Sequence, residues 1–487
     1  MVIRQKFGAG VAWMAFGNWT EQAVNFIVFI LLARLLDTEA FGLLAMASVA
    51  IVLAEFLVRE SLTEYLIAAE APGAEDFNAV FWLLLLLGAG LTASALMLSG
   101  PIARAYGHDE IAPLTVALSP TILMIAATAV PVAVLRREMA FRSLSLRAIT
   151  GVIAGGLAGV GLALAGFGVW ALIGQRLAQV LANIAVAWFA VPWRPGLRTS
   201  RAHLREAASF GGRVMALRAS ELAITQVPTV AIGAVLGPAA TGLYSVAWRL
   251  IETASFLIVT PLRMAAQPAF AAMNRGGQGE AAHLLADISR LSGFLAFPAF
   301  AGIAALAGPL LHVLFGPGWE GAACPLAILA AAGIYFCVEK VQMAFGLAAG
   351  QAGRLAFLGW AAVAVALPLG AAAAFLGPPV VAAAFVIALL AFAPARFALV
   401  AGQSGVPVRS LAGVHLVPAV LSAVMAAAVL AARAAVSLAP VWTVVLGVAI
   451  GVAVYAALTL AFQRDRLRLL LSFIRAPHPA ADGPETS

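Results

Sequence analysis

The sequence predicts an all-α polytopic membrane protein with about fourteen transmembrane helices, arranged as two pseudo-symmetric six-helix bundles plus two C-terminal helices. Three observations support this fold class: the composition, a succession of long apolar segments and an internal repeat. Apolar residues make up 63% of the 487 residues and charged residues 10%, compared with roughly 45–50% and roughly 25% in soluble domains. This composition is typical of a chain that lies mostly within a bilayer.

Long apolar segments follow one another along the chain. A helix needs about 20 mostly apolar residues to cross the hydrocarbon core, and loops with glycine, proline or charged residues separate about fourteen such segments. The predicted spans are roughly 10–34, 40–58, 78–99, 112–135, 148–167, 168–191, 209–236, 239–269, 287–313, 322–348, 354–376, 378–403, 411–435 and 440–463. Because no polar stretch exceeds about 25 residues, we expect no folded soluble domain.

An internal repeat relates residues 36–57 to residues 236–257, 200 positions later. The residues shared by the two copies are, numbered in the first, Leu36, Ala40, Gly42, Leu43, Ala47, Ile51, Ala54, Phe56 and Leu57. Duplicated bundles are typical of secondary transporters, whose two halves rock around a site at their interface. The repeat therefore predicts a carrier. Its expected parts are an N-terminal six-helix lobe at 1–200, a C-terminal six-helix lobe at 201–404, two additional transmembrane helices at 405–463 and a basic cytoplasmic tail at 464–487.

Arginines gather in some connections between the spans and are nearly missing from the others. The arginine-rich ones follow the fourth, sixth, twelfth and last spans and contain Arg136, Arg137, Arg142, Arg194, Arg198, Arg201, Arg205, Arg409, Arg464, Arg466, Arg468 and Arg475. By the positive-inside rule, this distribution predicts that both termini are cytoplasmic. The net charge of +7 fits arginines that meet anionic lipid headgroups, so membrane lipids and not nucleic acid are the expected contacts.

Polar residues within the spans are informative because a charge at bilayer depth costs at least about 2.5–3.5 kcal/mol. In the first span they are spaced i, i+3, i+4, i+7 and form one helical stripe: Asn18, Glu21, Gln22 and Asn25. The offset of 200 carries this stripe into the seventh span as Arg218, Glu221 and Thr225. The polar stripe is thus duplicated together with the repeat.

Two further charge pairs follow helical spacing. The eighth span carries Arg249 and Glu252 at i, i+3, and the second carries Glu55 and Arg59 at i, i+4. One interpretation of these charges is ion pairs that hold neighbouring helices in register. The other is a water-filled cavity between the halves, whose polar wall carries them toward a substrate. The sequence leaves both open.

Glycines of the fifth span have a packing interpretation. Gly151, Gly155 and Gly159 repeat every four residues and therefore lie on one face of the helix. Small residues on one face let a second transmembrane helix approach closely. We expect a tight helix contact there.

Enzyme signatures are missing from the sequence, which predicts that the protein is not an enzyme. A phosphate-binding loop of the type G-x-x-x-x-G-K-[ST] is excluded because the only lysines are Lys6 and Lys340. The sequence contains no H-E-x-x-H and no G-x-S-x-G, and the six histidines are scattered. No catalytic residue, metal site or cofactor is therefore predicted.

Several short motifs, in order along the chain to about residue 350, resemble the polysaccharide transporter or Wzx-like oligosaccharide flippase family. This family belongs to the multidrug/oligosaccharidyl-lipid/polysaccharide exporter superfamily. The motifs occupy 32–36 with Phe41 and Gly42, 135–138 with Phe141 and Arg142, 166–172, 193–195, 236–237 with 242–247, and 314–320. Each is short, but their order and spacing together are fairly specific.

The resemblance implies a flippase that moves an undecaprenyl diphosphate-linked oligosaccharide across the bacterial inner membrane by alternating access. It also implies a possible proton or sodium counter-ion and polysaccharide assembly proteins as partners. The candidates for substrate binding are Arg218 and Arg249, for the diphosphate, and Asn18, Gln22 and Asn25, for sugar hydroxyls. Thr225 is a further candidate for substrate binding. The candidates for ion coupling or charge pairing are Glu21, Glu221 and Glu252. A multidrug or small-cation exporter of the same superfamily, or a membrane polysaccharide polymerase, are the alternative functions.

Overall fold

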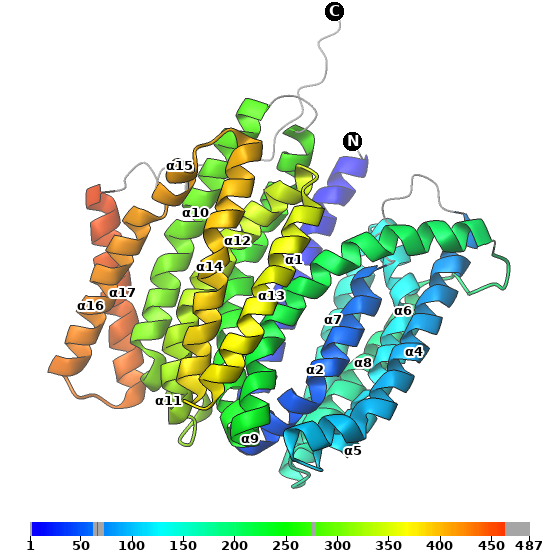
Figure 1. The fold of residues 1–487 in the computed structure, drawn as a ribbon, viewed down its shortest axis with the longest axis horizontal. Helices are drawn as coiled ribbons and strands as arrows, with labels where there is room; N and C mark the ends of the chain where they lie inside the picture. Colours follow the sequence, from blue (N-terminus) through cyan, green and yellow to red (C-terminus); the bar gives the residue numbers. More distant parts are fainter. Residues whose placement is uncertain (1, 62–65, 67–72, 200, 274–277, 463–487) are drawn as a thin grey trace, which may run out of the picture. The chain divides into compact units, whose positions relative to one another are not determined.

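The computed structural model describes residues 2–61, 66, 73–199, 201–273 and 278–462. Within these ranges every regular element is a helix (Figure 1), which confirms the predicted all-α class. Twelve helical segments of the described chain are long and apolar enough to cross a membrane. One of these, Arg218–Ile258, joins two helices across Gly237, where φ is 79°, and α1 (Val2–Leu35) is a further long helix of 34 residues. The fold therefore agrees with the prediction of about fourteen spans.

The chain forms two compact units. The first comprises residues 1–253, 314–325 and 352–392. Its helices are α1, α2 (Thr38–Ser61), α4 (Ala74–Tyr106), α5 (Ile111–Leu118), α6 (Pro120–Arg137), α7 (Phe141–Leu164), α8 (Trp170–Ala190), the first part of α9 (Arg201–Met273), η1 (Glu320–Ala322), α13 (Ala352–Ala374) and the first part of α14 (Pro378–Ser404).

The second unit comprises residues 254–313, 326–351 and 393–487. It contains the rest of α9 and α14, together with α10 (Gln278–Ala305), α11 (Ala307–Phe315) up to residue 313, most of α12 (Ala323–Ala348), α15 (Val408–Gly413), α16 (Leu416–Ala435) and α17 (Pro440–Phe462). The last two of these helices, orange and red in Figure 1, pack against each other and against α10.

The repeated segments touch each other at a reciprocal contact. A Cβ atom added to Gly42 in α2 would lie 2.9 Å from the Cα of Pro238 in α9, and one added to Gly242 would lie 2.8 Å from the carbonyl carbon of Thr38. Positions 42 and 242 are equivalent in the repeat, as are 38 and 238. A contact in which each copy uses the same two positions is what a pseudo-two-fold axis requires. The offset of 200 is thus a property of the fold.

The two equivalent helices begin with different local signals. The amide of Ala40 donates a hydrogen bond of 2.9 Å to the Asp37 carboxylate, which caps the start of α2. At the second copy, Gly237 takes the positive φ at which the preceding helix stops, and Pro238 stands at the first position of the next. Neither helix start places a large side chain at the contact, so the two backbones can approach each other closely.

The glycine face of α7 makes the tight contact that the sequence predicts. Added Cβ atoms would lie 2.8 Å from the Gln175 carbonyl oxygen at Gly155 and 2.8 Å from the Gln175 Cβ at Gly159, so α8 approaches this face closely. Gly151 of α7 faces Asn183 of α8, and a Cβ added to Gly151 would lie 3.0 Å from the Nδ2 atom of Asn183. This packing fixes the polar face of α8 in relation to α7.

Residues 314–320 hold the end of α1. The Trp319 indole donates to the Ala33 carbonyl at 3.0 Å, and the Arg34 Nε donates to the Leu314 carbonyl at 2.8 Å. The Trp319 ring also packs edge-on against Phe41, with ring centres 5.5 Å apart. The motif therefore ties the C-terminal end of α1 and the start of α2 to a segment almost 300 residues later.

Candidate functional site

A polar cavity of about 290 Å³ opens within the first unit. Its wall is built by α1, α2, α6, α7, α8 and α9. The polar residues that line it are Glu21, Asn25, Arg59, Thr128, Arg136, Arg147, Arg176, Gln179, Asn183 and Arg249. Five of these are arginines and one is an acid, so the described wall is strongly cationic.

Helical spacing explains why these side chains meet. Arg176, Gln179 and Asn183 are spaced i, i+3, i+7 on α8, and Glu21 and Asn25 are spaced i, i+4 on α1. Each set forms one face of its helix. The glycine face of α7 brings α8 close, so the polar stripe of α8 is directed to the same space as the stripe of α1.

Two of the cavity arginines are held by carboxylates outside the lining. Arg249 donates to Glu252 at 2.9 Å, one turn further along α9. Arg176 forms an ion pair with Glu55 of α2, whose other oxygen accepts a hydrogen bond of 2.6 Å from the Thr121 hydroxyl of α6. Glu55 is 5% exposed. Glu55 is thus buried behind Arg176, whereas Glu252 is 53% exposed beside Arg249.

The electrostatic character of this wall favours an anion. Guanidinium groups bind phosphate oxygens through paired, charge-assisted hydrogen bonds. Clefts of one sign with apolar surroundings also concentrate the field. Asn25, Gln179 and Asn183 add amide groups that can bind sugar hydroxyls beside a charged group.

The structure places the residues predicted from the sequence in different environments. Glu21, Asn25 and Arg249 line the cavity, whereas Asn18, Gln22 and Thr225 are half-buried and are not among its described lining residues. Arg218 pairs with Glu221 at 3.1 Å, also apart from that lining. The proposed roles of all these residues stay predictions.

Several residues that line the cavity are not among the site residues predicted from the sequence. Arg136 was expected in a cytoplasmic loop but lies in the last turn of α6 and lines the cavity. Arg147, Arg176, Gln179 and Asn183 carried no prediction. The i, i+3, i+7 pattern on α8 is the signal that identifies the last three.

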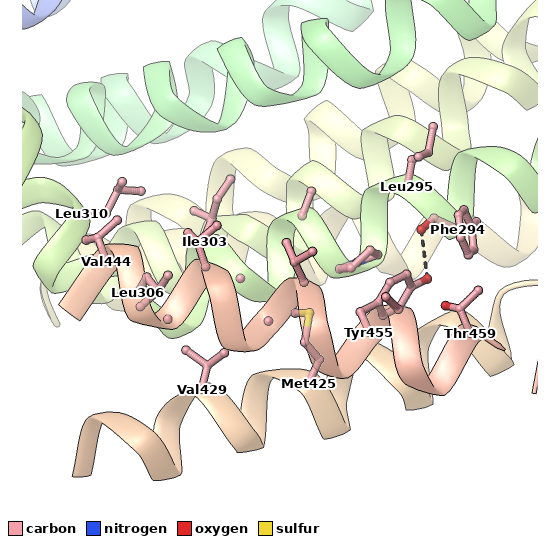
Figure 2. Close-up of a pocket in the computed structure, with 18 of the residues that line it drawn as sticks. Phe294, Leu295, Ile303, Leu306, Leu310, Met425, Val429, Val444, Tyr455 and Thr459 are labelled. Atoms are coloured by element: carbon pink, nitrogen blue, oxygen red, sulfur yellow. Dashed lines mark hydrogen bonds between the residues drawn. The ribbon is translucent and has the colours of Figure 1, made fainter. Parts of the chain in front are cut away.

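An apolar groove of about 590 Å³ lies in the second unit, between α10, α11, α16 and α17. Figure 2 shows Leu306, Ile303 and Val429 along its wall. The polar side chains in its described lining are those of Tyr455 and Thr459. The Tyr455 hydroxyl donates to the Phe294 carbonyl at 3.0 Å, which leaves an almost entirely hydrocarbon surface. Such a surface suits an alkyl or polyprenyl chain.

Known proteins resemble this chain in sequence. A family described as polysaccharide biosynthesis protein matches residues 31–324. The succinoglycan biosynthesis transport protein ExoT of Rhizobium meliloti is 26% identical over 320 residues, which are 66% of this chain and 65% of ExoT. The lipopolysaccharide biosynthesis protein WzxC of Escherichia coli is 23% identical over 339 residues, 69% of this chain and 68% of WzxC. The chain thus matches slightly less than two thirds of the length of ExoT.

Solved structures share the fold at low sequence identity. The lipid II flippase MurJ, in an inward closed conformation, has a TM-score of 0.77 at 14% identity, covering 93% of this chain and 99% of MurJ. An inward-facing multidrug resistance MATE family transporter of the MOP superfamily has a TM-score of 0.61 at 16% identity, covering 81% and 96%. Both have the two-lobed helical fold that the repeat predicts, which confirms the fold class. The family match over residues 31–324, more than half of the chain, shows that this multi-pass membrane protein belongs to the polysaccharide biosynthesis protein family.

Proposed function

We propose that the protein is a flippase that moves an undecaprenyl diphosphate-linked oligosaccharide across the bacterial inner membrane by alternating access. The observation that carries this proposal is the cavity lined by five arginines and three amide side chains. A diphosphate and its sugars cannot cross hydrocarbon unaided, because burying an unpaired charge is prohibitively costly. A hydrated cationic wall offers the diphosphate oxygens charge-assisted hydrogen bonds in place of water.

The apolar groove of the second unit supports the lipid-linked nature of the substrate. A polyprenyl chain in the bilayer already lies among hydrocarbon neighbours, so a site that receives it must offer packing contacts as apolar as lipid tails. In a bilayer the chain also needs a smooth hydrocarbon surface when it leaves its lipid neighbours. The groove offers such a surface over about 590 Å³. The names of ExoT and WzxC, which concern transport and biosynthesis of polysaccharides, agree with such a substrate.

The direction of transport follows from the charge of the substrate. With the cell interior negative, moving two negative charges outward is favoured by roughly 4–5 kcal/mol per 100 mV. In the proposed orientation both termini lie in the cytoplasm. The proposed division of the chain is a six-helix lobe at 1–200, a second six-helix lobe at 201–404 and two additional helices at 405–463. A proton or sodium counter-ion and polysaccharide assembly proteins remain proposed partners. A small-cation exporter is disfavoured because the arginine wall repels cations.

Reconstitution tests the proposed function directly. Purified protein in liposomes is expected to expose a labelled undecaprenyl diphosphate-linked oligosaccharide on the opposite leaflet, where an added glycosidase cleaves it. The same liposomes should not transport ethidium, because a cation meets a wall of like charge. The assay follows the cleaved fraction with time against protein-free liposomes. Ethidium transport without movement of the lipid-linked sugar would establish the exporter instead.

Filling the apolar groove should weaken binding of long lipid chains. Gly302 lines the groove, and a Cβ added there meets no atom within 4 Å, so Gly302→Leu enters open space. The leucine side chain would occupy part of the space that the lipid chain needs for its packing contacts. The apparent KM for a full-length polyprenyl substrate is therefore expected to rise.

The matched control is Gly90→Leu in α4, where an added Cβ also meets nothing within 4 Å, and Gly90 is not among the described residues that line the groove. Leucine is a better helix former than glycine by roughly 0.5–1 kcal/mol, so neither variant should lose stability. A substrate with a short lipid chain should be transported equally by both. Equal KM values of the two variants for the long chain would remove the groove from substrate binding.

A further inference from the structure

Arg176 is the cavity arginine that is paired with a buried carboxylate, that of Glu55. It lies on α8, its side chain is 34% exposed, and it lines the cavity. One of its terminal nitrogens donates to Glu55, and the described part of the chain gives Arg176 no other hydrogen-bond partner. A guanidinium has five N–H donors in a rigid plane. Most of them are therefore available on the cavity side.

Glu55 differs from the acid that lines the cavity. Glu21 shares the wall with the arginines, so a ligand can reach it. Glu55 is 5% exposed and is not among the described lining residues, although its partner Arg176 is. A carboxylate in this place can hold the guanidinium without meeting the ligand.

Thr121 fixes the carboxylate in turn. Its side chain is fully buried on α6, and its hydroxyl donates to Glu55 at 2.6 Å. The same hydroxyl lies 2.7 Å from the Leu118 carbonyl. A β-branched side chain has few rotamers, so the Thr121 hydroxyl stays beside Glu55, and its single hydrogen is shared between the Glu55 carboxylate and the Leu118 carbonyl. Three helices, α2, α6 and α8, thus meet in a chain of hydrogen bonds that ends at the cavity.

We propose that Glu55, restrained by Thr121, is a positioning residue that orients the guanidinium of Arg176 so that its open donors bind a diphosphate group in the cavity. Paired recognition of phosphate oxygens requires the planar fork to point at the ligand. An arginine that is already oriented loses less entropy on binding than a mobile one. The inference rests on the proposed function for the identity of the natural substrate, but its test uses a simpler anion.

The sign of one effect separates positioning from plain electrostatics. Glu55→Gln removes a negative charge near the cavity, so electrostatics alone predicts tighter anion binding. Positioning predicts the opposite, because a neutral amide holds the Arg176 guanidinium less firmly than the carboxylate does. We expect the affinity for inorganic pyrophosphate, measured by calorimetry on the full-length protein in lipid nanodiscs, to fall about tenfold, the lower end of what loss of a residue behind a metal ligand costs.

Thr121→Val provides a test in which no charge changes. Valine has nearly the shape of threonine but cannot donate to Glu55, and the variant is expected to bind pyrophosphate several-fold more weakly. Thr121→Ser keeps the hydroxyl and should retain most of the affinity. The matched control is Thr115→Val in α5: Thr115 is also fully buried, but its hydroxyl donates at 2.9 Å to the Ile111 carbonyl of its own helix. This control should bind pyrophosphate like the unchanged protein.

A double variant checks that the effect passes through Arg176. In the Arg176→Gln background, Glu55→Gln should cause no further loss, because interacting residues are not additive. Binding by Glu55→Gln and Thr121→Val as tight as that of the unchanged protein, or tighter, would overturn the positioning role and leave the anion cavity in place. If the unchanged protein itself binds no pyrophosphate, both the positioning role and the proposed anion site fail.

Discussion

Replacing Gly42 or Gly242 by alanine is expected to lower the free energy of unfolding by about 3 kcal/mol, the upper end of the range for overpacked sites. At Gly42 the added Cβ would lie 2.9 Å from the Cα of Pro238, and at Gly242 it would lie 2.8 Å from the carbonyl carbon of Thr38. Both neighbours are backbone atoms, which cannot rotate away as a side chain can. The two helices must therefore separate.

Reciprocity of this contact makes a sharper expectation possible. Since the two glycines are equivalent in the repeat and meet at one place, the first substitution already separates the helices. The double variant Gly42→Ala/Gly242→Ala should then cost clearly less than the sum of the single variants. Chemical unfolding of the purified protein measures all three. Gly161→Ala is the control, because an added Cβ there meets nothing within 4 Å, and it should be neutral or slightly stabilising. Fully additive losses would show that the sites are independent.

Loss of Arg249 is expected to reduce transport of the lipid-linked oligosaccharide roughly 10- to 150-fold. This range corresponds to about 1.5–3 kcal/mol for a hydrogen bond to a charged group. Arg249 lines the cavity, and both it and its partner Glu252 are exposed, at 41% and 53% of their side chains. Removing the arginine therefore leaves no buried charge, and the protein level should hold. Arg249→Lys should restore only part of the rate, because an ammonium lacks the planar fork.

The pair Arg218 and Glu221 provides a matched comparison on the same helix. It has the same i, i+3 spacing as Arg249 and Glu252, but its side chains are 22% and 16% exposed and do not belong to the described lining of the cavity. Arg218→Ala should therefore mainly lower the amount of protein, because it removes a positive charge beside the half-buried Glu221 carboxylate, and Arg218→Ala/Glu221→Ala should restore it. Transport and protein level are measured together for each variant. A greater loss of transport per molecule from Arg218→Ala than from Arg249→Ala would contradict the assignment of the cavity.

The fold was predictable because its signals are local or periodic. Apolar segments of about 20 residues are visible in any bilayer protein, and identities at an offset of 200 revealed the duplication. Breaks inside single predicted spans were harder to foresee. The span predicted at 112–135 is divided into α5 and α6 at Pro120, which lacks the amide that would continue the hydrogen-bond pattern.

The candidate site was only partly predictable, because pairing between distant helices leaves no local pattern. Of the stripe on α1, Glu21 and Asn25 line the cavity, whereas Asn18 and Gln22 are not among its described lining residues. Glu55 and Arg59, however, have the i, i+4 spacing of a pair within one helix, whereas the structure pairs Glu55 with Arg176, 121 residues away, and places Arg59 in the cavity wall. Which helix becomes the neighbour of α2 depends on packing, and the spacing of its own residues carries no information about it.

The contact between Gly42 and the second copy of the repeat also limits when this part of the fold can form during synthesis of the chain. Its two sides are 200 residues apart, and a ribosome that adds about 5–20 residues per second needs about 10–40 s to make that length. During this interval α2 exists without the backbone that later covers Gly42. The rate of synthesis therefore sets a lower limit on how soon the contact between α2 and the second copy can form.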